Sequence, residues 1–240
     1  MTNEKKIINI IKIILSLTVI YIFIKVLIAK KYVMALVSII TLIFFNLPNL
    51  IEKIFRVNFP PLLELSVCLF TFGAIIIGDI FEFYSIIPWW DDLLHFTSGF
   101  LFIAVGMFFI DIILKKNKKI YLPLILKIII SFCFTVTLLT ILECFEYGCD
   151  KLLGTDTQKD TIITKINSSE LVKDNKSDSK IIDINSLYVN NNNWMNLYGG
   201  YIDIGLNDTM NDLLDGFMGA LLFSIIDYFC LKNKGRKKLK

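Results

Sequence analysis

Residues 93–114 read LLHFTSGFLFIAVGMFFIDIIL, an apolar run with one aspartate and no lysine or arginine. An α-helix that crosses a bilayer core needs about 20 such residues. Similar runs occur at five other places in the chain, at 7–29, 32–47, 62–78, 121–147 and 210–231. Because lipid offers the backbone no hydrogen bonds and no run alternates like a barrel strand, each run is expected to be a helix. The sequence therefore predicts an all-α fold, a polytopic transmembrane bundle of about six spans that forms a single integral membrane domain over residues 1–240.

The overall composition agrees with a membrane location. The 240 residues are 55% hydrophobic with a mean hydropathy of +0.64, which is too apolar for an ordinary soluble domain. Charges nearly balance, with 25 Lys and Arg against 22 Asp and Glu, so nothing indicates a nucleic-acid partner. The five cysteines are scattered and include no CxxC pattern. The lipid bilayer is thus the partner that the composition predicts.

The distribution of charge predicts the orientation of the spans, because lysine and arginine are retained on the cytoplasmic side. Basic residues gather at 115–119 and in the tail 232–240, whereas 79–92 carries four acids and no base. We expect a protein of the bacterial cytoplasmic membrane with both termini in the cytoplasm. The lysines at 25, 30 and 31 do not fit this orientation.

A long polar stretch, 148–209, separates the last two spans and is expected to lie outside the cytoplasm. Much of it is rich in Lys, Asp, Ser, Thr and Asn, and such a composition buries little apolar surface. The sequence predicts a mobile loop or a small, weakly ordered excursion here.

Acidic residues near the outer ends of four spans are predicted to converge. Asp91 and His95 are spaced i, i+4, and Glu143 and Glu146 i, i+3, so each pair shares a helix face. Carboxylates with one imidazole suit a divalent cation, whose identity could be Mg, Mn, Zn or Fe. The predicted metal ligands are Asp91, His95, Glu143, Glu146, Asp212 and Asp215, and the predicted catalytic residues are Glu143, Glu146 and Asp212.

Simpler explanations compete with a metal for some of these residues. Asp92, Asn207 and Asp208 stand where helices begin and can act as caps or as the rim of a site. Glu143 and Glu146 come at the C-terminal end of a helix, where the macrodipole disfavours a carboxylate, so capping does not explain them. Protonated or cation-transporting carboxylates and solvated helix ends are the alternatives to a metal ion. The nearby small residues Gly99, Gly216, Gly219 and Ala220 favour close helix packing, with or without a chemical role.

Three strings carry a resemblance to a known family: WDDLLHFTSGF at 90–100, ECFE at 143–146 and NDTMNDLLDGFMGA at 207–220. Together they resemble the uncharacterised bacterial inner-membrane family typified by YjdF, in which these motifs recur in the same order. A weaker similarity connects them with VanZ-like membrane proteins, which are linked to glycopeptide resistance; the long outer loop departs from that pattern. The resemblance implies functional roles for eight residues, Asp91, His95, Gly99, Glu143, Glu146, Asp208, Asp212 and Asp215.

Three functions fit an acidic pocket at the outer membrane face. The first is a metal-dependent enzyme that acts on a lipid or envelope substrate through a metal-bound water. The second is a cation- or proton-coupled transporter, since carboxylates inside spans often bind ions or carry protons. The third is a non-catalytic envelope or resistance accessory protein. No nucleotide-binding glycine loop or Ser-His-Asp order is present to suggest another chemistry.

Overall fold

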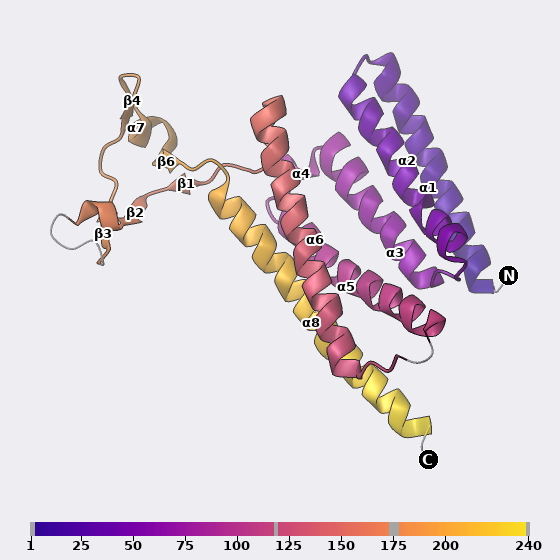
Figure 1. Cartoon of the computed structure of the whole chain (residues 1–240). Helices are drawn as coiled ribbons and strands as arrows, with labels where there is room; N and C mark the ends of the chain where they lie inside the picture. Colours follow the sequence, from indigo (N-terminus) through magenta and orange to yellow (C-terminus); the bar gives the residue numbers. More distant parts are fainter. Residues whose placement is uncertain (1–2, 118–119, 173–177, 239–240) are drawn as a thin grey trace. The chain divides into compact units, whose positions relative to one another are not determined.

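The computed structural model describes residues 3–117, 120–172 and 178–238. The chain forms two compact units, the first made of Met1–Thr140 and Asp212–Lys240 and the second of Ile141–Asn211. The main helices are α1 (Asn3–Ile28), α2 (Tyr32–Phe55), α3 (Pro61–Thr71), α5 (Trp90–Lys116), α6 (Leu124–Leu153) and α8 (Leu206–Lys238) (Figure 1). A π-helix, η1 (Phe72–Ile80), continues α3, and the short α4 (Phe83–Ile86) precedes α5.

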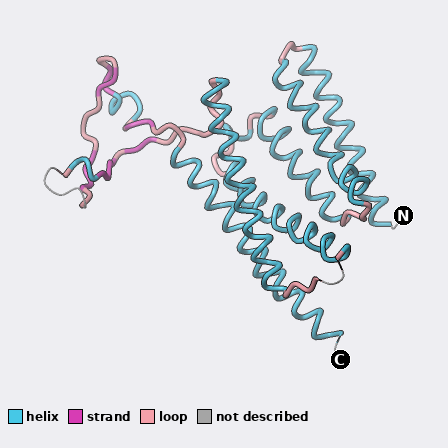
Figure 2. Tube along the Cα trace, in the orientation of Figure 1, coloured by secondary structure: helices cyan, strands magenta, loops and turns pink. Residues whose placement is uncertain are grey.

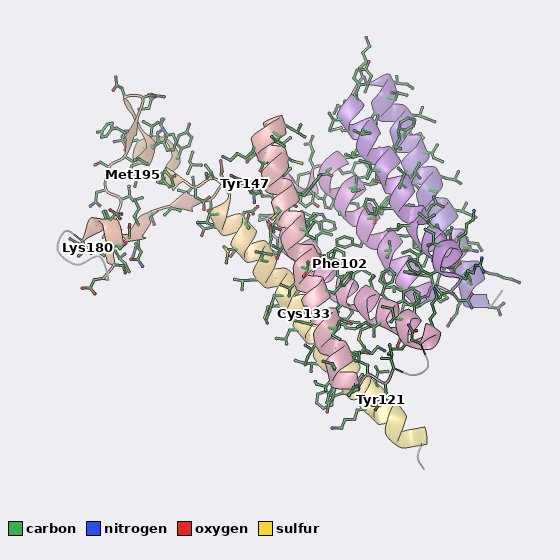
Figure 3. The ribbon with its side chains drawn as sticks, viewed as in Figure 1. Phe102, Tyr121, Cys133, Tyr147, Lys180 and Met195 are labelled. Atoms are coloured by element: carbon green, nitrogen blue, oxygen red, sulfur yellow. The ribbon has the colours of Figure 1, made fainter. Side chains whose placement is uncertain are left out.

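Six helices of the described chain are long and apolar enough to cross a membrane. They overlap the six predicted runs, so the predicted number of spans and the all-α bundle are confirmed. Many of their apolar side chains are exposed, and on α1 Ile13 is 57% exposed and Leu17 60%. Figure 3 shows the side chains that project from these helices. Only 17–33% of the residues in each span are buried within the protein, as expected where lipid replaces water as the solvent.

Helices α1, α2 and α3 lie side by side in the first unit and are joined by two ion pairs as well as by apolar packing (Figure 1). Lys5 Nζ lies 2.9 Å from Glu52 Oε1, which connects the start of α1 with the end of α2. Lys12 Nζ lies 2.9 Å from Glu64 Oε1, and their side chains are only 11% and 2% exposed. An apolar core that includes Val19 and Phe45 surrounds the middle of these helices. No sequence motif predicts either ion pair.

Helices α5 and α8 approach each other through glycine. A Cβ atom on Gly99 would come 1.8 Å from the carbonyl oxygen of Gly216, and one on Gly219 would come 1.9 Å from that of Phe96. The two backbones are therefore in direct contact, which a larger residue at either position would prevent. One turn further along, Phe100 and Phe223 pack edge to face with their ring centroids 4.6 Å apart.

The second unit contains all the strands of the described chain, as Figure 2 shows for the segment between α6 and α8. Short antiparallel pairs join β1 (Ile162–Ile163) with β6 (Tyr201–Ile202), β2 (Lys165–Ser168) with β3 (Lys180–Asp183), and β4 (Tyr188–Val189) with β5 (Asn192–Asn193). The short helices η2 (Ser169–Leu171) and α7 (Trp194–Tyr198) complete the unit. The polar composition of 148–209 did not predict these strand pairs.

Candidate metal centre

Three of the predicted ligands come together in the first unit. Asp91 lies in the first turn of α5, His95 lies one turn later, and Asp212 comes from α8. The Nε2 atom of His95 is 3.5 Å from Asp91 Oδ1 and 3.5 Å from Asp212 Oδ2. One ligand atom from each of the three residues lies within 4.8 Å of the other two. Oxygen and nitrogen ligands about 2.0–2.4 Å from one ion can lie up to about 4.8 Å apart, so the group is compact enough to hold a single cation.

Two members of this compact group are buried and the third, Asp91, is half-buried. The side chains of His95, Asp91 and Asp212 are 8%, 14% and 3% exposed. With both carboxylates ionised and a neutral imidazole, the three side chains would carry a net charge of −2. Burying such a charge is costly unless an opposite charge compensates it. A divalent cation between the three ligand atoms would balance the two carboxylates.

The glycine contact fixes the separation of the two helices that carry the ligands. Gly99 lies one helical turn after His95, and Gly216 lies one turn after Asp212. The close approach of Gly99 to Gly216 therefore lies directly beneath the pair His95 and Asp212. Rigid elements in contact hold ligand atoms more accurately than loops do.

A family model matches residues 10–233 of the chain, which include all three ligands and most of every span. The chain belongs to the family described as predicted membrane protein (DUF2238). No curated protein and no solved structure matches it. The DUF2238 match agrees with the expectation of a membrane protein family, and it carries no activity with it.

Three more acids of this DUF2238 protein lie near the ligands of the centre, in space or in the sequence. Asp91 interacts electrostatically with Asp79, which lies near the end of the π-helix η1. Asp92 interacts in the same way with Asp215, which is half-buried. The compact group does not include Asp215, so its role as a ligand stays a prediction. Asp79 belongs to the acidic stretch 79–92 of the sequence but is not among the predicted ligands. In the structure it lies in a π-helix, a rare conformation that is frequent at functional sites.

Glu143 and Glu146 belong to the second unit, where both lie on α6 with the spacing that the sequence predicts. The side chain of Glu143 is buried, with 5% exposed, and that of Glu146 is half-buried. A buried carboxylate near the C-terminal end of a long apolar helix is unfavourable without compensation. Their part in a metal site rests on the sequence and stays a prediction.

The three predicted cap or rim residues of the DUF2238 protein have different surroundings. Asp92 lies in the first turn of α5 beside Asp215, as described above. Asp208 Oδ2 accepts a hydrogen bond of 2.7 Å from the backbone N–H of Lys159, and the Asn207 side chain donates to Thr161 Oγ1 at 3.0 Å. Within the second unit, Asn207 and Asp208 thus attach the polar segment to the first turn of α8.

A further acid that organises this turn is Asp203, which is only 4% exposed. Its carboxylate accepts hydrogen bonds from the backbone N–H groups of Thr161 (2.9 Å), Asn207 (3.1 Å) and Gly205 (3.3 Å). Burial acts to raise the pKa of Asp203, but these donors outweigh it and hold the pKa below its ordinary value. No motif of the sequence singles out Asp203. In the structure its hydrogen bonds connect the residue before β1 and the start of α8 with the end of β6.

Proposed function

We propose that this protein binds a divalent metal ion through Asp91, His95 and Asp212 and uses it to hydrolyse a lipid or other amphiphilic envelope substrate. The observation that carries the proposal is the compact group of two carboxylates around the buried imidazole of His95, with Nε2 3.5 Å from an oxygen of each. Three protein ligands leave positions on the ion for water and substrate, which is the arrangement of catalytic rather than structural sites. An ion of this kind lowers the pKa of a bound water and so supplies a nucleophile at neutral pH.

The position of the group supports an amphiphilic substrate. Asp91 and His95 lie at the start of a span and Asp212 lies near the start of another, so the site is close to one membrane surface. The charge pattern of the sequence predicts that this is the outer surface. At that depth a substrate can keep its acyl chains in the bilayer and present its polar part to the ion. Glu143, from the sequence, is the candidate general base, and Glu146 the candidate further ligand.

Metal content of the purified full-length protein tests this proposal. Elemental mass spectrometry should find about one divalent ion per chain, and His95→Ala and Asp212→Asn should each lose most of it. Asp183→Asn is the matched control, because Asp183 is 70% exposed in the second unit and its loss removes the same charge. A folded, metal-free wild type would contradict the proposal, as would equal metal content in all four proteins. If the wild type contains the metal, the metal-loaded protein is next assayed for hydrolysis of lipid and envelope substrates.

A second candidate function, cation or proton coupling, is favoured by the ion pair of Lys12 and Glu64. Both side chains are almost fully buried within spans, where ionisable residues often mark an ion path. Proteoliposomes containing the wild type would show a proton or cation flux that Glu64→Gln abolishes. The hydrolase proposal predicts no such flux.

A further inference from the structure

A cavity of about 750 Å³ lies at the C-terminal ends of α2 and α5, whereas Asp91 and His95 lie at the N-terminal end of α5. Four basic side chains line it, Lys53 and Arg56 from the end of α2 and Lys115 and Lys116 from the end of α5. Asn58 adds an amide and Phe108 an apolar wall. The volume is within the range of about 300–1,000 Å³ that is typical of small-molecule sites.

The two acids that line this cavity form ion pairs with lysines that lie outside it. Glu52 pairs with Lys5 at 2.9 Å, and Asp111 pairs with Lys127 of α6. Neither Lys5 nor Lys127 lines the cavity. Among the described residues, no ion pair engages the four basic side chains, although Lys116 Nζ lies 5.5 Å from the centroid of the Phe55 ring. The cavity therefore presents an uncompensated positive charge.

The cavity is also built on a rigid frame. Phe55 packs against Phe109 with ring centroids 5.9 Å apart, and Phe59 packs against Phe108 at 4.8 Å. The backbone N–H of Phe59 donates to Glu52 Oε1 at 2.8 Å, which closes the turn after α2. Arg56, in this turn, has a φ of 53°, a left-handed conformation that is uncommon for arginine. These contacts keep the end of α2 in place beside α5.

We propose that this cavity binds the phosphate group of an anionic ligand, either the headgroup of a membrane phospholipid or a soluble phosphate ester. Arginine and lysine are the side chains that recognise phosphate, arginine through paired hydrogen bonds and lysine through its charge. Basic cavities between the ends of membrane helices are typical sites for anionic headgroups. The positive-inside rule predicts that this end faces the cytoplasm. The proposal is independent of the metal centre.

Native mass spectrometry of the full-length protein in detergent tests it, with phosphatidylglycerol, phosphatidylcholine and glycerol 3-phosphate as separate probes. The wild type should retain an anionic probe in preference to phosphatidylcholine. Each basic residue near a membrane surface contributes about fivefold to the affinity, so Lys53→Gln with Arg56→Gln should weaken binding about 25-fold. Lys115→Gln with Lys116→Gln, on α5, should weaken binding by the same factor. This second variant keeps the proposal testable if the Arg56 variant does not fold.

The control is Lys30→Gln with Lys31→Gln. It removes two exposed lysines that follow the C-terminal end of α1 and do not line the cavity. It should bind the anionic probe like the wild type. Preference for phosphatidylglycerol assigns the site to a lipid headgroup, and preference for glycerol 3-phosphate assigns it to a soluble ester. Equal binding of phosphatidylcholine, no binding of either anion, or an equal loss in the control variant would overturn the proposal.

Discussion

Gly99 of α5 lies so close to Gly216 of α8 that a Cβ on Gly99 would be 1.8 Å from the Gly216 carbonyl oxygen. That distance is far below any real contact of a Cβ atom, so the two helices cannot keep their separation with a larger residue there. Because His95 and Asp212 lie one turn before these glycines, the backbone contact and the metal ligands form one structural assembly. Packing in this part of the protein thus controls the geometry of the candidate site.

Gly99→Ala is therefore expected to reduce metal binding without removing a ligand. The added methyl group must push α5 and α8 apart, and overpacking of this kind costs about 1–3 kcal/mol or more. Elemental mass spectrometry and thermal unfolding of the purified variant measure the two effects. Gly148→Ala is the control, because Gly148 lies in α6 with nothing within 4 Å of the new Cβ. Normal metal content in Gly99→Ala would show that the close contact does not position the ligands.

The buried pair of Lys12 and Glu64 leads to a prediction about stability. Lys12→Met leaves the Glu64 carboxylate, 2% exposed, without its cation, and breaking a buried ion pair costs about 3–5 kcal/mol. Lys12→Met combined with Glu64→Leu removes both charges and should recover most of that loss. Unfolding in mixed micelles with increasing dodecyl sulfate measures both variants. Lys6→Met, at an exposed position of α1, is the control and should change little. Equal stability of the single and double variants would contradict this account.

The spans could be predicted from the sequence because a run of about 20 apolar residues is a local property. Their ends were harder to place. The apolar run predicts a second span that ends at 47, whereas α2 continues to Phe55. Pro48 lies inside this helix, and Asn49 and Glu52 lie on its last turns. These residues lower the hydropathy of the sequence after 47, so the apolar run ends there. The helix nevertheless continues, and its last turns are stabilised by the ion pair between Glu52 and Lys5 of α1. Tertiary contacts of this kind do not appear in a window of sequence.

Residues of the candidate site that are close together in the sequence could be grouped from the sequence, and distant ones could not without a further assumption. Asp91 and His95 are one turn apart on one helix, so their spacing was enough to group them. Asp212 could be added only because helix ends at the same depth were assumed to converge. Lys12 and Glu64 are 52 residues apart and share no motif, so nothing in the sequence connected them. The strand pairs of the second unit are two to four residues long, which is too short for an alternating pattern to be recognised.

Glu143 provides a test of the part of the site that rests on the sequence alone. Glu143→Gln keeps the size of the side chain and removes its charge, so a ligand or general base would be lost without a packing defect. We expect reduced metal content and loss of any metal-dependent hydrolysis. Cys144→Ser is the matched control at the neighbouring exposed position of α6. Full metal content and activity in Glu143→Gln would remove Glu143 from the site and leave Asp91, His95 and Asp212 as its candidate residues.

Asp203 gives the second unit a predicted dependence on pH. Its pKa is held below the ordinary value of 3.8 by donors that exist only in the folded unit, so its ionised form favours folding. This contribution is fully present above the unfolded pKa and is lost as the pH falls through the lower, folded one. The backbone N–H of Thr161, which donates to Asp203 Oδ1 at 2.9 Å, reports on it through hydrogen exchange, corrected for the intrinsic rate at each pH. We expect its protection to fall on acidification in the wild type and to be weak at every pH in Asp203→Ala, while Asp183→Asn behaves like the wild type. Strong, pH-independent protection of Thr161 in Asp203→Ala would show that the strand pair of β1 and β6 forms without this carboxylate.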